Sequence, residues 1–240
     1  MFDDARAKLD RADKHIAELE DEFLKFSKSH PAATAAVIAD GTFRLSAAPP
    51  PMPKALAAIL GDAVNNLRTP LDLVAYKLAA VGSKPKFPFA KSIENFPQEL
   101  KKSGIASQKV RDYVENVVRP YKGGDSDIWA LHDTDIISKH HTLIPAQGNT
   151  TLNNVSFVDG NGNTFKNCSF SGSAGSSFVV SDSPLTFSNR GKTDTTMHFT
   201  ADSGFGQVPI IEKLHELSAK LRGIISDIEK IVAEEKKGNV

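Results

Sequence analysis

Two long amphipathic segments, one at each end of the chain, constrain the fold more than any other feature. In the first, apolar residues recur alternately three and four positions apart over residues 2–26, with charged residues between them. In the second, a similar spacing runs from Ile210 to Ile231, directly after Pro209. Such spacing places apolar side chains on one face of a helix. We therefore expect two long terminal helices that pack together in a bundle or, alternatively, pair with a second copy as a homodimer.

The composition narrows the class of protein. The 240 residues include 29 Lys and Arg and 29 Asp and Glu, so the formal net charge is +0 and nucleic acid would need a local basic patch. The single cysteine, Cys168, cannot form an internal disulfide, which suits a reducing compartment. No apolar run approaches the roughly 18 residues of a membrane helix. We expect a cytoplasmic protein with no membrane contact, and no residue pattern indicates a cofactor.

Between the terminal helices the residue pattern changes twice. Two short runs of strand-forming residues flank Asp40-Gly41, which predicts a β-hairpin over 34–47. From Thr151 the chain becomes rich in Ser, Thr, Asn, Gly and Phe, and its alternating apolar positions predict about five short strands over 151–206. The expected fold class is α+β, a helical bundle with an N-terminal β-hairpin and an antiparallel sheet inserted before the C-terminal helix.

We expect one domain over 1–240. Its helical body would comprise 1–150, hairpin included, and 207–236, with 151–206 as the β insertion. A second helix would begin near Pro53 and be kinked or restarted at Pro70, and another would run from Asp125 or Ser126 to about Leu143.

Each of these two inner helices carries an unexpected polar stripe. On the first, Asn65, Arg68 and Asp72 are spaced i, i+3 and i+7, so they share one face. On the second, the corresponding residues are His132, Asp135 and Lys139, with His140 beside them. Charged and titratable groups inside a helical core are costly unless they pair or serve a function.

The two stripes, if they meet, can pair in two ways. Arg68 can reach Asp135, and His132 or His140 can reach Asp72. A buried network of this kind would fix how the helices register, which is the structural interpretation. The functional interpretations need the same residues to remain accessible.

Three motifs in this part of the chain resemble those of a family of uncharacterised bacterial proteins. The segment from Gly61 to Asp72, Arg119-Pro120-Tyr121, and the segment from Trp129 to His140 correspond in order to "G-D-x-x-H-N-L-R-S-A-L-D-H", "Q-P-Y" and "L-H-x-L-D-x-x-D-K-H-R". The resemblance covers 33–144 and implies a bacterial source and, more distantly, kinship with helical-bundle ribonucleases of the HEPN type. It brings no established activity. The chain departs from the motifs at four positions, Asn65, Leu73, Ser138 and His141.

Three functional interpretations compete with the structural one. A HEPN-type ribonuclease needs a histidine four to six residues after its arginine, and none follows Arg68 at that distance. A metal site from His132, His140 and Asp72 or Asp135 would use histidines eight apart, where helical ligands stand four apart, so we predict no metal. Alternatively, Asn65, Arg68 and Lys139 would supply donors to a small anion or a partner protein.

A second, weaker signal is a group of lysines interleaved with phenylalanines. These residues could contact nucleic acid, or the lysines could be solvated beside an apolar anchor. The group comprises Lys84, Lys86, Lys91, Lys101 and Lys102 with Phe87, Phe89 and Phe96.

The sequence thus favours a small-ligand or protein binding module whose partner is unknown. The alternative is a hydrolase acting on nucleic acid, with His132 or His140 as acid or base and Arg68 holding phosphate. The candidate catalytic residues for that alternative are Arg68, Asp72, His132, Asp135, Lys139 and His140.

Overall fold

The computed structural model describes residues 1–30, 33–39, 42–49, 51–80, 85–140, 143–173 and 177–238. The described part of the chain divides into two compact units. The helical unit comprises Met1–Glu20, Lys54–Pro145 and Ala201–Val240, and the strand unit comprises Asp21–Pro53 and Ala146–Thr200. The α+β class predicted from the sequence is confirmed.

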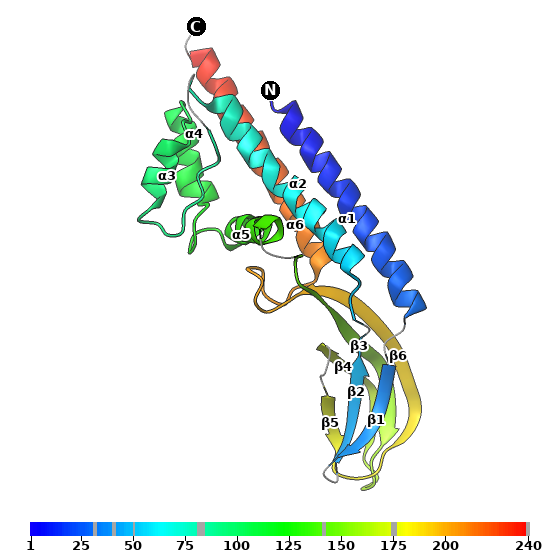
Figure 1. Cartoon of the computed structure of the whole chain (residues 1–240). Coiled ribbons are helices and arrows are strands. Elements are labelled where there is room, and N and C mark those ends of the chain that lie inside the picture. The colour runs from blue at the N-terminus through cyan, green and yellow to red at the C-terminus, as the bar shows by residue number, and fades with distance from the viewer. Residues whose placement is uncertain are drawn as a thin grey trace. The chain divides into compact units, whose positions relative to one another are not determined.

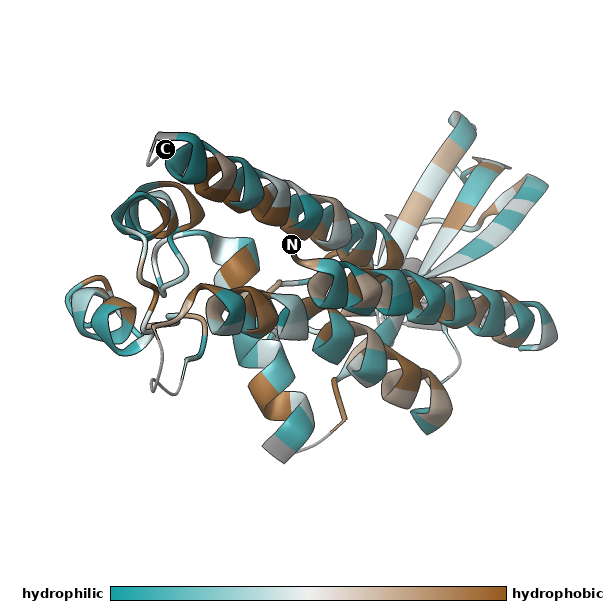
Figure 2. Cartoon of the chain, turned by 90° about the horizontal axis from the view of Figure 1, so that it is seen from above, coloured by the Kyte–Doolittle hydropathy of each residue, from teal (hydrophilic) through white to brown (hydrophobic). Residues whose placement is uncertain are grey.

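The helical unit is built on three long helices. These are α1 (Asp3–Ser29, of which the part up to Glu20 belongs to this unit), α2 (Lys54–Leu78) and α6 (Ile210–Gly238). Figure 1 shows the three running alongside one another, and Figure 2 shows hydrophilic and hydrophobic residues alternating along them. Acidic residues begin α1 and α6 and basic residues end them, which suits the helix dipole.

The apolar residues of the terminal helices face inward. Leu9 and Ile16 of α1 and Leu214 and Leu221 of α6 are fully buried, as is Leu67 of α2. Polar pairs close the α1–α6 seam. Arg6 pairs with Glu229, and Arg222 lies 2.8 Å from Asp10 and 2.6 Å from Asp13. The two terminal helices therefore pack against each other within one chain.

Helix α2 continues through Pro70 without a break, so the restart at Thr69 does not occur. The Thr69 hydroxyl instead donates to the carbonyl of Asn65 at 2.7 Å. This bond engages a carbonyl in the turn before Pro70, where the proline itself cannot donate. The helix thereby presents Asn65, Arg68 and Asp72 in one continuous row.

A long connection joins α2 to the next long helix, α5 (Ser126–His140). It contains α3 (Phe96–Lys102), α4 (Gln108–Tyr113) and the π-helical turn η1 (Val114–Val118). Isolated bridges fix it at two points, Ala79 to Ile105 and Ala90 to Tyr121. The Asp125 carboxylate accepts from the backbone N–H of Asp127 and of Ile128, which caps α5 as predicted.

The strand unit contains two antiparallel three-stranded sheets. One has the order β1-β2-β5 and the other β4-β3-β6. The strands are β1 (Ala33–Ala39), β2 (Thr42–Ala48), β3 (Ala146–Val158), β4 (Thr164–Ser173), β5 (Ser177–Ser181) and β6 (Thr186–Phe199). Leu152, Val155 and Phe157 form the buried centre of the second sheet.

The predicted hairpin is formed by β1 and β2, which pair from Ala33 with Ala48 to Ala39 with Thr42. Its turn, Asp40-Gly41, lies outside the described residues. β2 also pairs with β5, which comes from the inserted segment. The hairpin is therefore grouped with the inserted strands rather than with the helices. In the described part of the chain, no helix is long and apolar enough to cross a membrane.

Candidate functional site

The two polar stripes meet where α2 packs against α5. Gly61 of α2 permits this approach, because a Cβ built there would lie 2.9 Å from the Ser138 hydroxyl of α5. Nearer the middle of the contact, the Asn65 amide donates to Asp135 Oδ1 at 3.0 Å. Both helices thus present to each other the residues that the sequence placed on one face.

Arg68 is the centre of the first polar group, which we call the Arg68 cluster: Arg68, Asp72, Phe89 and His132. The Arg68 side chain is 8% exposed, and its Nη1 lies 2.7 Å from Asp72 Oδ2. Its Nε donates to His132 Nδ1 at 3.2 Å, and its Cζ lies 4.5 Å from the centre of the Phe89 ring. The guanidinium therefore holds an acid, an imidazole and an aromatic ring at once.

His132 is held as a neutral imidazole. Its ring stacks on Phe89 with centroids 4.0 Å apart and an interplanar angle of 8°. Burial, followed by the positive charge of Arg68, lowers the pKa of His132 to about 4, against a smaller opposing effect of Asp72. Because Nδ1 accepts from Arg68, the ring proton of the neutral form is on Nε2.

Asp72 is also engaged on its second oxygen. Oδ1 accepts from the backbone N–H of Phe87 at 2.9 Å, which ties the segment after α2 to the helix. One oxygen of Asp72 thus forms an ion pair with the guanidinium and the other accepts a backbone N–H. Asp72 therefore serves to position Arg68 and the Phe87–Phe89 segment.

The second polar group consists of Asn65, Asp135 and Lys139. Asp135 is 4% exposed, and its two oxygens accept from Asn65 and, at 2.7 Å, from Lys139 Nζ. The predicted pairing of Arg68 with Asp135 is thus wrong. Arg68 instead finds its carboxylate one turn further along its own helix, at Asp72. Of the predicted partners of Asp72, His132 meets it only through Arg68.

The remaining histidines of the stripe lie at the end of α5. His140 is the last residue of that helix, and its side chain lies outside the described part of the chain, as does the whole of His141. Within the described residues, no three His, Cys, Asp or Glu side chains are grouped so as to hold a metal ion.

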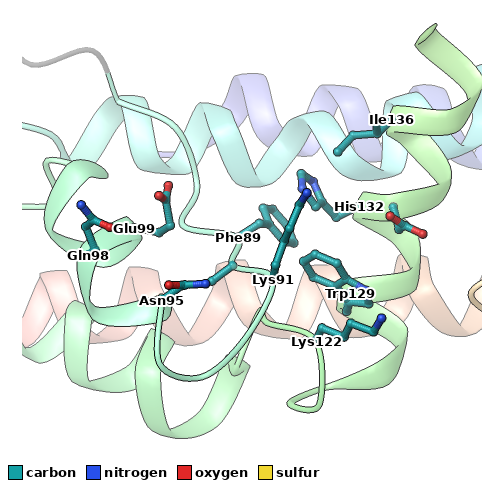
Figure 3. Close-up of a pocket in the computed structure, with 11 residues that line it drawn as sticks. Phe89, Lys91, Asn95, Gln98, Glu99, Lys122, Trp129, His132 and Ile136 are labelled. Carbon is teal, nitrogen blue, oxygen red and sulfur yellow. The ribbon is translucent and has the colours of Figure 1, made fainter. Parts of the chain in front are cut away.

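A cleft of about 710 Å³ lies directly beside the Arg68 cluster (Figure 3). One side is formed by α5, the other by α3 and the residues before it, and the segments around Ala90 and Lys122 connect them. The lining residues are Phe89, Ala90, Lys91, Asn95, Gln98, Glu99, Lys122, Trp129, His132, Asp133 and Ile136. Two of the eleven, Phe89 and His132, belong to the Arg68 cluster, so the cleft and the cluster share a wall.

Several polar side chains of the cleft have no partner within the described part of the protein. Lys91, Lys122 and Asp133 form no ion pair there, and the Asn95 side chain does not cap α3. Glu99 differs, because it pairs with Lys102 at 2.8 Å. Unpaired polar groups beside aromatic rings in a concave site are typical of ligand-binding pockets.

Residue spacing predicted three members of the Arg68 cluster, Arg68, Asp72 and His132, but few residues of the cleft. Asn65, Arg68 and Lys139 were the predicted anion donors, yet all three make contacts with neighbouring carboxylates, imidazole or amide groups. Two sequence signals reached the cleft: the polar stripe, through His132, and the alternation of lysine and phenylalanine over 84–102, through Lys91 and Phe89. Trp129 and Lys122 carried no such signal.

Comparisons of the chain with protein-family models, with curated proteins and with solved structures found no match. The resemblance to bacterial proteins with the three motifs therefore stays a prediction. The function has to be argued from the geometry alone.

Proposed function

We propose that this chain is a small-ligand binding module whose ligand occupies the cleft between α3 and α5. The proposal rests on a difference between the polar side chains of the Arg68 cluster and those of the adjacent cleft. The acid and the imidazole of the Arg68 cluster are both held by its guanidinium, whereas Lys91, Lys122 and Asp133 of the adjacent cleft have no ion-pair partner in the described chain.

The Arg68 cluster gives the cleft a rigid wall. Asp72 fixes Arg68 and the backbone of Phe87, and Arg68 fixes the His132 ring, which stacks on Phe89. Binding sites gain affinity when their side chains are already held in the bound geometry, since less conformational entropy is lost on binding. The network thus supports the site from behind, and only its Phe89 and His132 rings reach the cleft.

The cleft also has suitable size and chemistry for a small molecule. Its volume of about 710 Å³ falls in the roughly 300–1,000 Å³ range of ligand pockets. Trp129, His132 and Phe89 provide ring surface, and Lys91 and Lys122 provide positive charge. We therefore expect ligands that combine a planar ring with an anionic group.

The hydrolase alternative has less support. A general base works best when its pKa lies near the working pH, and that of His132 is lowered to about 4. Arg68, which would hold a phosphate, is buried and already paired with Asp72. We also propose a bacterial cytoplasmic setting, which rests on the motif resemblance and the single cysteine.

The test uses Trp129, the only tryptophan of the chain, as a reporter inside the cleft. A library of small planar anions is screened against ¹⁵N-labelled protein, and the single indole N–H resonance is followed. Binders are expected to shift this resonance, and Lys122→Ala to weaken them while the exposed Lys109→Ala on α4 does not. If no compound moves the indole resonance, the cleft is not a ligand site and the proposal fails.

A further inference from the structure

Two lysines are brought to the cleft by one structural device. The parallel bridge between Ala90 and Tyr121 is made by two hydrogen bonds, Ala90 N to Pro120 O at 3.2 Å and Lys122 N to Ala90 O at 3.1 Å. The residues that follow the bridge on its two segments are Lys91 and Lys122, and both line the cleft. Their backbones are consequently neighbours, and their flexible four-carbon stems let both ammonium groups approach one anion.

The charge of these lysines favours a phosphate over a carboxylate. Neither has a carboxylate partner among the described residues. Of the two acids that line the cleft, Glu99 is paired with Lys102, and Asp133, on α5, forms no ion pair with either lysine. A phosphate monoester carries about −1.5 to −2 charges at pH 7, so it can satisfy two ammonium groups at once. A carboxylate, with a single charge, would leave one lysine unmatched.

The α5 side of the cleft offers an aromatic surface. Trp129 is half-buried, and its ring is tilted by 59° to that of His132, with centroids 5.6 Å apart. One face of His132 is already covered by Phe89, so the exposed part of the Trp129 ring is the surface on which a planar ligand can stack (Figure 3). Nucleobases stack on aromatic side chains in this way whatever their identity.

The opposite side offers groups that can recognise the edge of a base. Asn95 and Gln98 present side-chain amides, each with a donor and an acceptor, and the described residues supply no partner for either. Asp133, on α5, is an acceptor for a sugar hydroxyl or an exocyclic amine. Amides and a carboxylate around a ring surface fit a base and its ribose better than a hydrocarbon ring.

Together these groups point to a free nucleoside monophosphate as the ligand of the cleft, with its base on Trp129, its phosphate at Lys91 and Lys122, and its polar edge towards Asn95 and Gln98. This inference rests on the proposed function, because it names the ligand class of the same cleft. It places the nucleotide beside the Arg68 cluster and assigns no reaction to it.

The experiment titrates AMP, GMP, CMP and UMP into the full chain and follows the fluorescence of Trp129, with calorimetry for the variants. Saturable quenching is expected with at least one nucleotide, because the base stacks on the only tryptophan. Lys91→Ala and Lys122→Ala should each weaken binding about tenfold, as expected for loss of one charge-assisted contact. The matched variant Lys109→Ala should bind like the parent, and circular dichroism checks that all variants are folded.

Four outcomes would overturn the inference. If nucleosides bind as tightly as their monophosphates, the cleft has no phosphate site. The same conclusion follows if the lysine variants bind nucleotides like the parent. A 5′-phosphorylated trinucleotide that binds more tightly than any mononucleotide would identify an RNA strand as the ligand instead. If the nucleotides are silent but aromatic carboxylates shift the Trp129 resonance, the nucleotide is wrong and the proposed binding function stands.

Discussion

The contact between α1 and α6, here called the aliphatic seam, and the contact between α2 and α5, the polar seam, differ in the side chains that they bury. Along the first, most buried residues are apolar, with His15 and Ser218 as buried polar exceptions, and the charged pairs, such as Arg222 with Asp10 and Asp13, remain at the edge. Along the second, Arg68 and Asp135 lie inside the contact and the cleft opens beside them. The first seam thus contributes mainly apolar burial, whereas the second accepts the desolvation of charge and gains rigid, directional groups next to a cleft.

The sharpest test of the aliphatic seam is Leu9→Ala, for which we expect the largest loss of stability. Leu9 is fully buried, so the substitution removes apolar contacts and leaves a cavity. Such changes cost about 4 kcal/mol in well-packed sites. Urea denaturation of Leu24→Ala, on an exposed position of the same helix, provides the control, and equal losses in the two variants would contradict the packing described for α1.

Arg68→Ala tests the polar seam and should come next in size. The substitution removes the partner of Asp72 and the donor to His132, and it uncovers the Phe89 ring. Arg68 is 8% exposed but Asp72 is 42% exposed, so breaking this half-buried pair should cost about 2 kcal/mol, less than for a fully buried pair. The free energy of unfolding is the measurement, and Arg68→Lys should recover part of the loss because it restores the charge without the bond from Nε. A loss below that of an exposed ion pair would show that the cluster is not structural.

The polar seam should also make stability depend on pH between pH 5 and pH 7. The pKa of His132 is about 4 in the folded chain and about 6.5 when unfolded, so below pH 6.5 the unfolded state binds more protons. Stability is therefore full above pH 6.5 and falls as the pH drops towards 4. Since the ring is partly accessible, we expect a loss of about 1 kcal/mol between pH 7 and pH 5.

His132→Gln isolates this pH effect. Glutamine keeps an acceptor for Arg68 but does not titrate between pH 5 and pH 7. The parent should lose stability at pH 5 through His132 and the variant should not, so the difference between their free energies of unfolding should be smaller at pH 5 than at pH 7. Denaturation curves at the two pH values measure it. A parent and a variant with the same pH slope would show that His132 is not the titrating group.

The smallest effect is expected at the rim of the aliphatic seam. The Arg222 side chain is 38% exposed, and its pairs with Asp10 and Asp13 are screened by water and salt. Arg222→Ala should therefore cost less than about 1 kcal/mol. Arg222→Ala and Arg68→Ala each remove an arginine that pairs with a carboxylate. If both variants lose a similar free energy of unfolding, the two seams do not differ as described.

The sequence predicted the positions of the helices and strands better than it predicted which of them pair. Periodicity identified the terminal helices, the hairpin and the strands of the inserted segment, because the side-chain repeat of a helix or strand is local. It could not pair β2 with β5, since alternation carries no information about a strand more than a hundred residues away. Pairing across such distances depends on the whole fold rather than on either segment.

The same limit applies to the site. Spacing placed Arg68 and His132 on facing stripes, but the axial offset of α2 against α5 decides which residues meet, and that offset depends on contacts such as Gly61 with Ser138. No spacing or motif singled out Trp129 or Lys122 as a candidate site residue. Both residues line the cleft because the bridge at Ala90 places the segment of Lys122 next to that of Lys91, between α3 and α5.

The two bridges in the α2–α5 connection also bear on motion. One side of the cleft lies on α5, which is a continuous helix. The other side lies on the connection between α2 and α5, which consists of short elements. The Ala79–Ile105 and Ala90–Tyr121 bridges and the hydrogen bond from Phe87 to Asp72 hold this connection in place. Side-chain bonds to α6, from Ser107 to Glu235 and from Tyr113 to Asp227, also hold the connection, but short elements open more readily than a continuous helix. The amides of residues 85–125 should therefore exchange with solvent before those of α5, and a ligand that joins the two sides would slow that exchange.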